Sequence, residues 1–274
     1  MLALTGATGH VGGLVAARVA DLQPRLVVRD PSRAPAGFDV RVCTYDDHAA
    51  SVSALQGVDV LFMVSASESA TRRAEHRTFV RAAADAGVRH VVYTSFLGAA
   101  PDAGFALARD HFDCERAIGE SGMAATFLRD NFYLDVLARY CDAAGVYRGP
   151  AGSGRVSGVA RADVADVAAA VLRSPDRHVG SSYDLTGAEA LTFAEIAART
   201  GAVLGRQLRY VEETVEEAYA SRRAGWPDAA QWQLDAWVST YTAIRDGELE
   251  RISPDVERLT GHPPRRLEDV LTTG

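Results

Sequence analysis

The sequence predicts an α/β protein: a doubly wound parallel sheet with helices on both faces, followed by a smaller, mostly helical C-terminal cap. Two observations predict this class. Short apolar runs alternate with amphipathic stretches through most of the chain, and a glycine-rich turn joins the first run to the first helical pattern. We expect residues 1–185 to form the sheet domain and residues 186–274 the substrate-binding cap, with some interleaving.

The expected strands of the first half are apolar runs bounded by turn residues. They are the opening "MLALT", then "RLVVRD", "VRVCTY", "VDVLFMVSA" and "VRHVVYTSF". After Gly122, "ATFLRDNFY" predicts a sixth strand, and a long helical stretch is expected to run through Tyr140. The glycine-rich residues 145–160 indicate a flexible excursion, and residues 161–174 a helix whose acidic start suits the helix dipole. Residues 179–185 still belong to the sheet, and residues 228–244 predict a helix that carries tryptophans.

Composition narrows the class of protein. A chain of 274 residues with 47% hydrophobic and 24% charged residues is typical of a globular protein, and a net charge of -7 gives no electrostatic support for a nucleic-acid partner. The three cysteines are far apart and have no metal-ligand spacing, so we expect no metal site and a reducing, cytoplasmic setting. No apolar run approaches the roughly 18 residues of a membrane-spanning helix, and we expect no membrane partner.

The glycines at positions 6, 9 and 12 form a G-x-x-G-x-x-G motif between the first strand and the first helix. The first glycine permits a tight turn, the second lets backbone N–H groups approach a pyrophosphate, and the third allows close helix packing. Because the motif opens a series of strand–helix units, it predicts a dinucleotide site on a Rossmann sheet.

The end of the second strand indicates which dinucleotide binds. Arg29 stands there and Arg33 follows, and a guanidinium can pair with the 2′-phosphate of NADP, so NADP is favoured over NAD. Two alternatives stay open: Asp30 could turn toward a ribose hydroxyl instead, or both arginines are solvated surface charges.

Five segments together resemble one family. "LTGATGHVGG", "VVRDPSR", "HRTFVRAAADAGVRHVVYTS", "GESGMAATFLRDNFY" and "LTGHPPRRLEDVL" are similar to the NmrA-like atypical short-chain dehydrogenase/reductases, with the nearest likeness to type 2 NAD(P)H:quinone oxidoreductases and triphenylmethane reductases. The resemblance implies cofactor contacts at Gly6, Thr8, Gly9, His10, Val11, Arg29, Thr44 or Asp46, Ser65, Ala66, Tyr93, Thr94 and Ser95.

The proton source of such a reductase is unusual here. All 29 basic residues are arginine, so the Tyr-x-x-x-Lys pair of ordinary short-chain reductases is impossible. In the isoflavone-reductase branch of the family a lysine is the acid/base, and the resemblance places His111 at its position, with Asp110 or Glu115 to orient it or to compete for the role. Histidine titrates near neutrality and can do this chemistry. The alternative is that His111 only caps or decorates its helix and that the reduced acceptor takes protons from water.

The segment after the sixth strand completes the expected site. The resemblance implies that Asn131, Phe132 and Tyr133 bring an amide, an aromatic face and a phenol near the nicotinamide, with Asn131 and Tyr133 as catalytic candidates beside His111. Core packing is the alternative for Phe132. Trp226, Trp232 and Trp237 could line the cap, although the helical spacing of the last two favours core packing.

The sequence thus predicts an NAD(P)H-dependent oxidoreductase, a monomer or homodimer, that transfers hydride to a quinone or similar flat aromatic acceptor. One alternative is a tailoring oxidoreductase or monooxygenase of aromatic polyketide biosynthesis that acts on a quinone, hydroquinone or anthrol. Another is an NmrA-like redox sensor that binds NADP without turnover.

Overall fold

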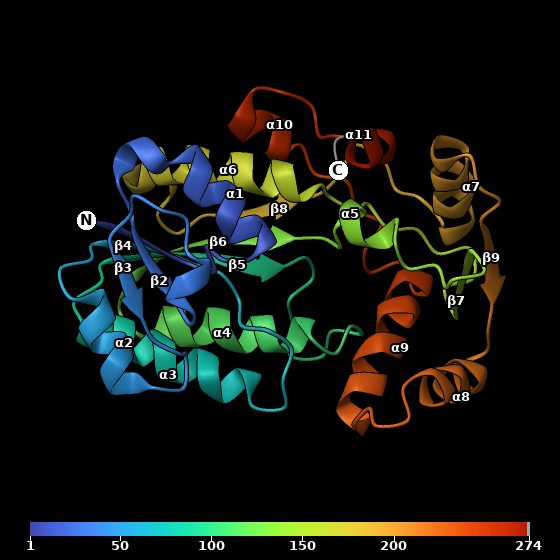
Figure 1. The fold of residues 1–274 in the computed structure, drawn as a ribbon, viewed down its shortest axis with the longest axis horizontal. Coiled ribbons are helices and arrows are strands. Elements are labelled where there is room, and N and C mark those ends of the chain that lie inside the picture. The colour runs from blue at the N-terminus through green and yellow to red at the C-terminus, as the bar shows by residue number, and fades with distance from the viewer. Residues whose placement is uncertain (273–274) are drawn as a thin grey trace. The chain divides into compact units, whose positions relative to one another are not determined.

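The computed structural model describes residues 1–272, and Figure 1 shows its elements. Its contacts divide the chain into two units. The first unit comprises Met1–Pro101, Asp110–Arg129 and Arg161–Tyr183, and the second comprises Asp102–Arg109, Asp130–Ala160 and Asp184–Gly274. The second unit therefore takes in residues 102–109 and 130–160 as well as the C-terminal part of the chain. None of the helices within residues 1–272 combines the length and the apolar composition that a membrane-spanning segment needs.

A seven-stranded sheet in the order β3-β2-β1-β4-β5-β6-β8 confirms the Rossmann-type class. Its strands are β1 (Leu2–Thr5), β2 (Arg25–Val28), β3 (Val40–Val42), β4 (Val60–Met63), β5 (His90–Phe96), β6 (Ala124–Asp130) and β8 (Ser182–Leu185). Strands β3, β2, β1, β4 and β5 pair in parallel, with Leu4 opposite Leu26 on one side and Phe62 on the other. The order reverses beside β1, which is where an open α/β sheet binds its ligand.

Helices cover both faces of this sheet (Figure 1). Helices α1 (His10–Arg18) and α6 (Arg161–Arg173) lie on one face, and α2 (His48–Leu55), α3 (Arg72–Asp85) and α4 (Ala108–Glu120) on the other. Short 3-10 turns occupy Ala20–Leu22, Pro31–Arg33 and Pro175–His178. A core of fully buried side chains, among them Leu61, Phe79 and Ile118, fills the space on the second face. Its burial supplies the hydrophobic free energy that holds the layers together.

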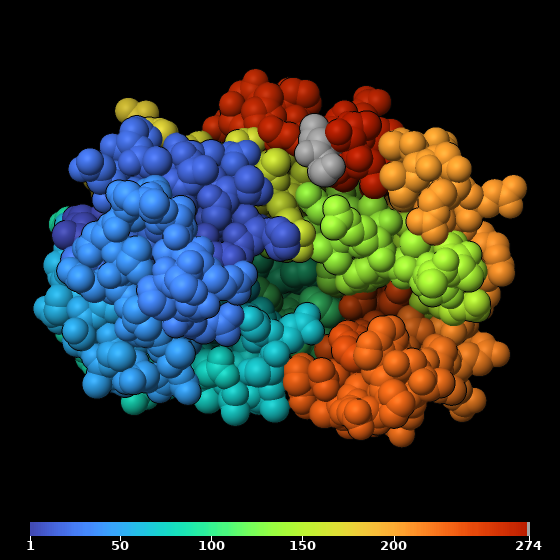
Figure 2. Space-filling view, viewed as in Figure 1, coloured from blue at the N-terminus to red at the C-terminus, as the bar shows by residue number. Residues whose placement is uncertain are grey.

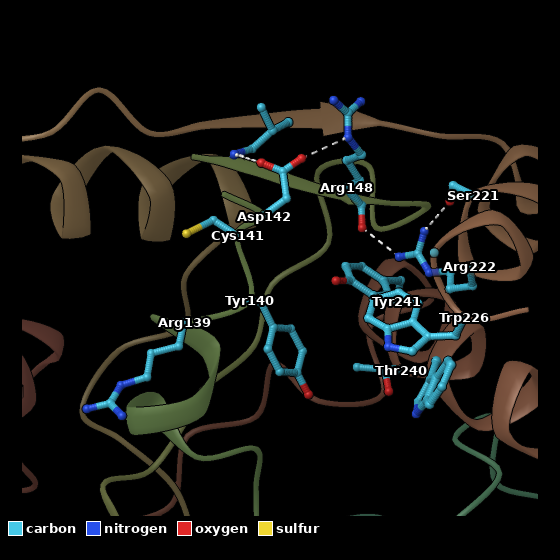
Figure 3. Close-up of a pocket in the computed structure, with 13 residues that line it drawn as sticks. Arg139, Tyr140, Cys141, Asp142, Arg148, Ser221, Arg222, Trp226, Thr240 and Tyr241 are labelled. Atoms are coloured by element: carbon cyan, nitrogen blue, oxygen red, sulfur yellow. Dashed lines mark hydrogen bonds and ion pairs between the residues drawn. The ribbon is translucent and has the colours of Figure 1, made fainter. Parts of the chain in front are cut away.

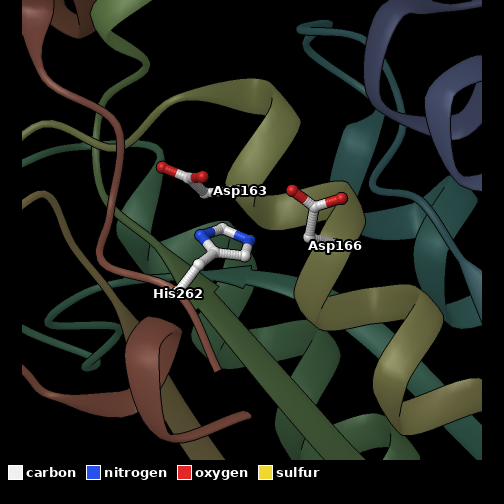
Figure 4. Close-up of side chains that lie close together, drawn as sticks. All are labelled: Asp163, Asp166 and His262. Carbon is white, nitrogen blue, oxygen red and sulfur yellow. The ribbon is translucent and has the colours of Figure 1, made fainter. Parts of the chain in front are cut away.

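An ion pair joins helix α6 to α1 through an acidic residue in the first two turns of α6. Figure 4 shows Asp163 and Asp166 about one turn apart on this helix. Asp163 is fully buried, and the Asp166 carboxylate accepts a hydrogen bond from Nε of Arg18 at 2.5 Å. The pair joins the two helices of one face, so the acidic start of α6 fixes a neighbour in addition to matching the helix dipole.

The second unit is mostly helical. Its helices are α5 (Leu134–Leu137), α7 (Phe193–Leu204), α8 (Val215–Gly225), α9 (Gln231–Arg245), α10 (Asp255–Thr260) and α11 (Leu267–Thr272), and β7 (Val146–Gly149) pairs in parallel with β9 (Arg209–Glu212). Figure 2 shows the lime-green residues of α5 and β7 beside the orange residues of α8 and α9. Capping boxes at Thr192 with Glu195 and at Thr214 with Glu217 start α7 and α8.

Two sequence-based expectations in this unit were wrong. The helix expected to run through Tyr140 ends at Leu137, because the Asp142 carboxylate accepts hydrogen bonds from the backbone of Ala144 and Val146 and turns the chain into β7. The expected flexible excursion at residues 145–160 contains β7, whose Tyr147 is fully buried. Its partner β9 lies about sixty residues further along the chain, so no local pattern revealed the pairing.

The packing of α1 on the first turn allows no side chain at Gly12. A Cβ at this position would lie 2.2 Å from the carbonyl oxygen of Gly6, whereas one at Gly119 in α4 would meet nothing within 4 Å. We predict that Gly12→Ala lowers the free energy of unfolding by about 1–3 kcal/mol, as overpacking does. Gly119→Ala, the matched control in a helix, should leave stability unchanged or raise it by up to about 1 kcal/mol. Urea unfolding of both variants is the measurement, and equal stabilities would contradict the close approach.

Candidate functional site

The turn between β1 and α1 has the geometry of an anion cradle. Gly6 has φ +67°, which a side chain would strain, and its carbonyl accepts the N–H of Gly9 at 2.9 Å. Helix α1 begins at His10, and no described side chain caps its N-terminus. The first N–H groups of the helix are therefore left for a ligand, as in phosphate-binding turns. The predicted residues Gly6, Thr8, Gly9, His10 and Val11 all lie in this turn and the start of α1.

The end of β2 presents positive charge beside this turn. Arg29 is exposed, and Nη2 of Arg33 lies 3.3 Å from the carbonyl oxygen of Thr8. The Asp30 carboxylate instead accepts hydrogen bonds from the N–H of Ser32 at 3.0 Å and its hydroxyl at 2.6 Å, which lower the pKa of that carboxyl. Because Asp30 caps the 3-10 turn that follows, its carboxylate is occupied within the loop, whereas an NAD site requires an acidic residue that can accept from the ribose. Arg29 and Arg33 are the basic groups of this loop.

The loops after β3 and β4 form the next part of the same edge. Thr44 and Asp46 are exposed, and a hydrogen bond from Thr44 lowers the pKa of Asp46. The Ser65 N–H donates to Oγ1 of Thr94 at 3.0 Å, and the Ala66 N–H donates to Nε2 of His76 at 2.8 Å. These bonds hold the loop after β4 against β5 and α3.

A buried charge network lies at the end of β5. Tyr93, Thr94 and Ser95 are all at most 3% exposed. The Ser95 hydroxyl donates to Oε1 of Glu115 at 2.6 Å, and the Arg129 guanidinium donates to both oxygens of the same carboxylate, at 2.9 and 2.6 Å. A bidentate arginine–carboxylate pair is among the stronger ion pairs, so it fixes β5, α4 and β6 relative to one another.

His111 is buried, and both of its ring nitrogens have partners. Nδ1 lies 3.1 Å from the Tyr93 hydroxyl, and Nε2 lies 3.1 Å from Nη2 of Arg72. A guanidinium only donates, so Nε2 must accept and the ring proton sits on Nδ1. Burial, and then the Arg72 charge, hold the pKa of His111 well below its usual value. The ring is thus neutral, and it must take up a proton before it can act as an acid. Its catalytic role stays a prediction.

Asp110 and Glu115, the groups weighed as partners of His111, are engaged elsewhere. The Asp110 carboxylate pairs with Nε of Arg73 at 2.5 Å and lies 3.7 Å from Nη1 of Arg72. Glu115 belongs to the network with Ser95 and Arg129. The described contacts give His111 the partners Tyr93 and Arg72 in their place.

The segment after β6 lies in the second unit and is largely internal. Asn131 is 1% exposed; its amide nitrogen donates to Oγ of Ser157 at 2.9 Å and to the carbonyl of Leu249 at 3.0 Å, and its oxygen accepts the N–H of Phe132 at 2.8 Å. Phe132 packs edge-on against Phe105, with ring centroids 5.0 Å apart. In this position Asn131 links its own segment to those of Ser157 and Leu249. Its catalytic role stays a prediction.

Tyr133 leads to a residue that the sequence reasoning did not single out. Its hydroxyl donates to Oδ2 of Asp130 at 2.7 Å, while Oδ1 of Asp130 is buried with no hydrogen-bond partner among the described residues. Burial raises the pKa of Asp130 to about 8. The signal available in the sequence was an acidic residue directly at the end of an apolar strand. Arg72, the partner of His111, gave no such signal, because only the tertiary fold brings α3 against α4.

Comparisons with known proteins agree with this geometry. Residues 6–175 match a family model described as NAD(P)H-binding. Over 99% of its length the chain is 34% identical to quinone oxidoreductase 2 of Escherichia coli, covering 98% of that protein. Over 98% it is 36% identical to a (4-alkanoyl-5-oxo-2,5-dihydrofuran-3-yl)methyl phosphate reductase of Streptomyces griseus, covering 96% of that protein.

Solved structures give the same result. The NADPH complex of the Escherichia coli quinone oxidoreductase superposes with a TM-score of 0.90 at 32% identity, covering 100% of this chain and 99% of that one. The Citrobacter triphenylmethane reductase complexed with NADP(H) gives 0.88 at 28% identity, again covering 100% and 99%. A mutant of NmrA, at 16% identity, a TM-score of 0.73 and coverage of 98% and 93%, shares the fold. The chain belongs to the NAD(P)H-binding family and is an NAD(P)H-dependent oxidoreductase.

Proposed function

We propose that this protein transfers a hydride from NADPH to a quinone or a similar flat, conjugated aromatic acceptor. The observation that carries the proposal is the full-length similarity to a quinone oxidoreductase, combined with a chain that contains no lysine for ordinary carbonyl chemistry. A quinone needs a well-placed hydride donor, and its reduced oxygens can take protons from water. The protein therefore has to bind, orient and shield the reactants more than it has to move protons.

The turn at Gly6 and Gly12 fits the cofactor, because a Cβ at Gly6 would clash with the Val64 side chain and a Cβ at Gly12 with the Gly6 carbonyl. Only glycine permits the tight turn and the close approach of α1 that present the N-terminus of the helix to a pyrophosphate. When bound, NADPH supplies the hydride. The turn and the start of α1 would hold its pyrophosphate, and Arg29 and Arg33 would hold its 2′-phosphate. The engagement of Asp30 with Ser32 supports NADPH over NADH, because an acidic residue free to accept from a ribose hydroxyl would favour NADH.

Acceptors that need a proton from the protein would take it from His111 or from Tyr133, whose hydroxyl is bonded to Asp130. His111 exchanges a proton only after it has been protonated against burial and the Arg72 charge. Asn131 would serve by fixing the backbone turn that carries Tyr133.

The cofactor preference is tested at Arg29. We predict that Arg29→Ala raises the KM for NADPH about ten- to hundredfold, the cost of a lost charge-assisted hydrogen bond, and leaves the KM for NADH nearly unchanged. Arg41→Ala, which removes another exposed arginine near the same sheet edge, is the control. An unchanged ratio of the two KM values in Arg29→Ala would count against the assignment.

The acid role of His111 is tested with two acceptors. We predict that His111→Ala slows reduction of an aromatic ketone at least tenfold and reduction of 2-methyl-1,4-naphthoquinone less than threefold, since a proton-transfer group contributes about 10²-fold or more where it acts. The ketone rate of the wild type should rise as the pH falls, because the pKa of His111 is lowered. His111→Gln keeps an acceptor for Arg72 but cannot supply the proton. If it restores the ketone rate, His111 acts by position alone.

The charge state of Asp130 is tested by the stability of the protein. Its pKa is raised to about 8 in the fold, so the folded state holds a proton that the unfolded chain releases near pH 4. The stability that this group contributes is therefore complete below pH 4 and is lost as the pH rises to about 8, with a slope of up to about 1.4 kcal/mol per pH unit. We predict that Asp130→Asn removes this slope and is more stable than the wild type at pH 9. Parallel stability curves from urea unfolding at pH 5 to 9 would show that Asp130 is ionised in the fold.

A further inference from the structure

The second unit contains a cavity of its own, of about 720 Å³, between the segment after α5, strand β7 and helices α8 and α9. Its volume lies within the range of about 300–1,000 Å³ typical of small-molecule sites. Figure 3 shows Tyr140 on one side and Tyr241 with Trp226 on the other. All of its lining residues belong to the second unit, so the cavity is formed without any residue of the nucleotide-binding turn.

The walls of the cavity are aromatic and partly uncovered. Trp226 is 59% exposed and packs against Trp237 with ring centroids 5.3 Å apart, and Tyr140, 37% exposed, lies 6.5 Å from the ring of Tyr241. Neither indole N–H has a hydrogen-bond partner among the described residues. An exposed tryptophan beside a second one, both on a cavity wall, indicates a surface that a flat aromatic molecule would cover.

The charged groups of the lining favour an anion. The buried Arg222 is held by the Glu213 carboxylate and by the Arg148 carbonyl at 2.6 Å, with its guanidinium 5.1 Å from the Tyr241 ring centroid. Arg148 itself pairs with Asp142 at 3.5 Å. Arg139 is exposed and forms no ion pair within the described part of the chain. The lining thus keeps one guanidinium unmatched and two indole N–H groups unused, and Figure 3 shows Arg139 on the side of Tyr140, opposite Trp226.

We propose that this cavity is a binding site for a planar aromatic anion, a fused-ring molecule with a sulfonate, carboxylate or phosphate group. The ring system stacks on Trp226 and Tyr140, and the acidic group is attracted by Arg139. The proposal stands on the second unit alone and holds whether or not the protein reduces quinones.

The binding test compares two naphthalene derivatives of similar shape, one charged and one uncharged, neither of which is a quinone. Isothermal titration of the full chain, without cofactor, should give one equivalent of 2-naphthalenesulfonate bound and at least threefold weaker binding of the uncharged 2-naphthalenesulfonamide. Arg139→Gln should abolish this preference. Trp226→Leu should weaken both molecules about three- to tenfold, the range of an aromatic pair.

Matched controls come from the same unit. Arg209→Gln removes an exposed arginine of β9, and Trp232→Leu removes a tryptophan of α9, and neither residue lines the cavity. Both should bind as the wild type does, and thermal unfolding verifies that every variant is folded. No saturable binding at millimolar 2-naphthalenesulfonate, or equal losses in Arg139→Gln and Arg209→Gln, would overturn the proposal.

A kinetic experiment distinguishes whether the cavity binds the hydride acceptor or a separate aromatic anion. If 2-naphthalenesulfonate inhibits reduction of 2-methyl-1,4-naphthoquinone competitively, the cavity takes the acceptor; if inhibition is not competitive, it takes a separate molecule. Binding without any quinone turnover would remove the proposed function and keep this site. Quinone turnover without binding of 2-naphthalenesulfonate would keep the proposed function and remove this site.

Discussion

The close approach of α1 to the turn after β1 is the constraint on which the nucleotide-binding unit depends. The turn reverses at Gly6 with a positive φ, and α1 packs so closely that a Cβ at Gly12 would meet the Gly6 carbonyl oxygen at 2.2 Å. This contact aims the uncapped N-terminus of α1 at the end of the sheet, where an anion can meet its first N–H groups. The ion pair between Arg18 and Asp166 then holds α1 against α6 on the same face.

Around this edge, the polar side chains at the strand ends are mostly committed to one another. Ser95, Glu115 and Arg129 form one buried network, and Tyr93, His111 and Arg72 form another. Networks that are satisfied internally resist rearrangement, since a lost partner would leave a buried polar group alone. The edge is therefore a rigid platform, which suits a reaction that depends on placing a hydride donor against a flat acceptor.

Asp130 differs from these groups because one of its buried oxygens has neither a hydrogen bond nor an ion pair among the described residues, whereas Nη1 of Arg72, which also lacks a hydrogen bond, lies 3.7 Å from the Asp110 carboxylate. A buried carboxyl in such surroundings stays protonated, and its hydrogen bond with Tyr133 joins two exchangeable protons at one strand end. The cavity of the second unit shows a related pattern at its surface, where Arg139 and two indole N–H groups lack partners in the described chain. Groups left unsatisfied in an otherwise satisfied fold are the natural places to expect ligands.

The sequence by itself determined the sheet class, the succession of the first six strands along the chain and the phosphate turn, because strand alternation and glycine spacing are local properties. It also determined that no lysine takes part in the chemistry. Only the tertiary structure decided that β7 pairs with β9, that burial and the Arg72 charge hold His111 neutral, that Asn131 bonds to Ser157 and Leu249, and that Trp226 and Trp237 line a cavity. Each of these depends on residues far apart in the chain, whose meeting no local pattern encodes and whose burial alone sets their ionisation and exposure.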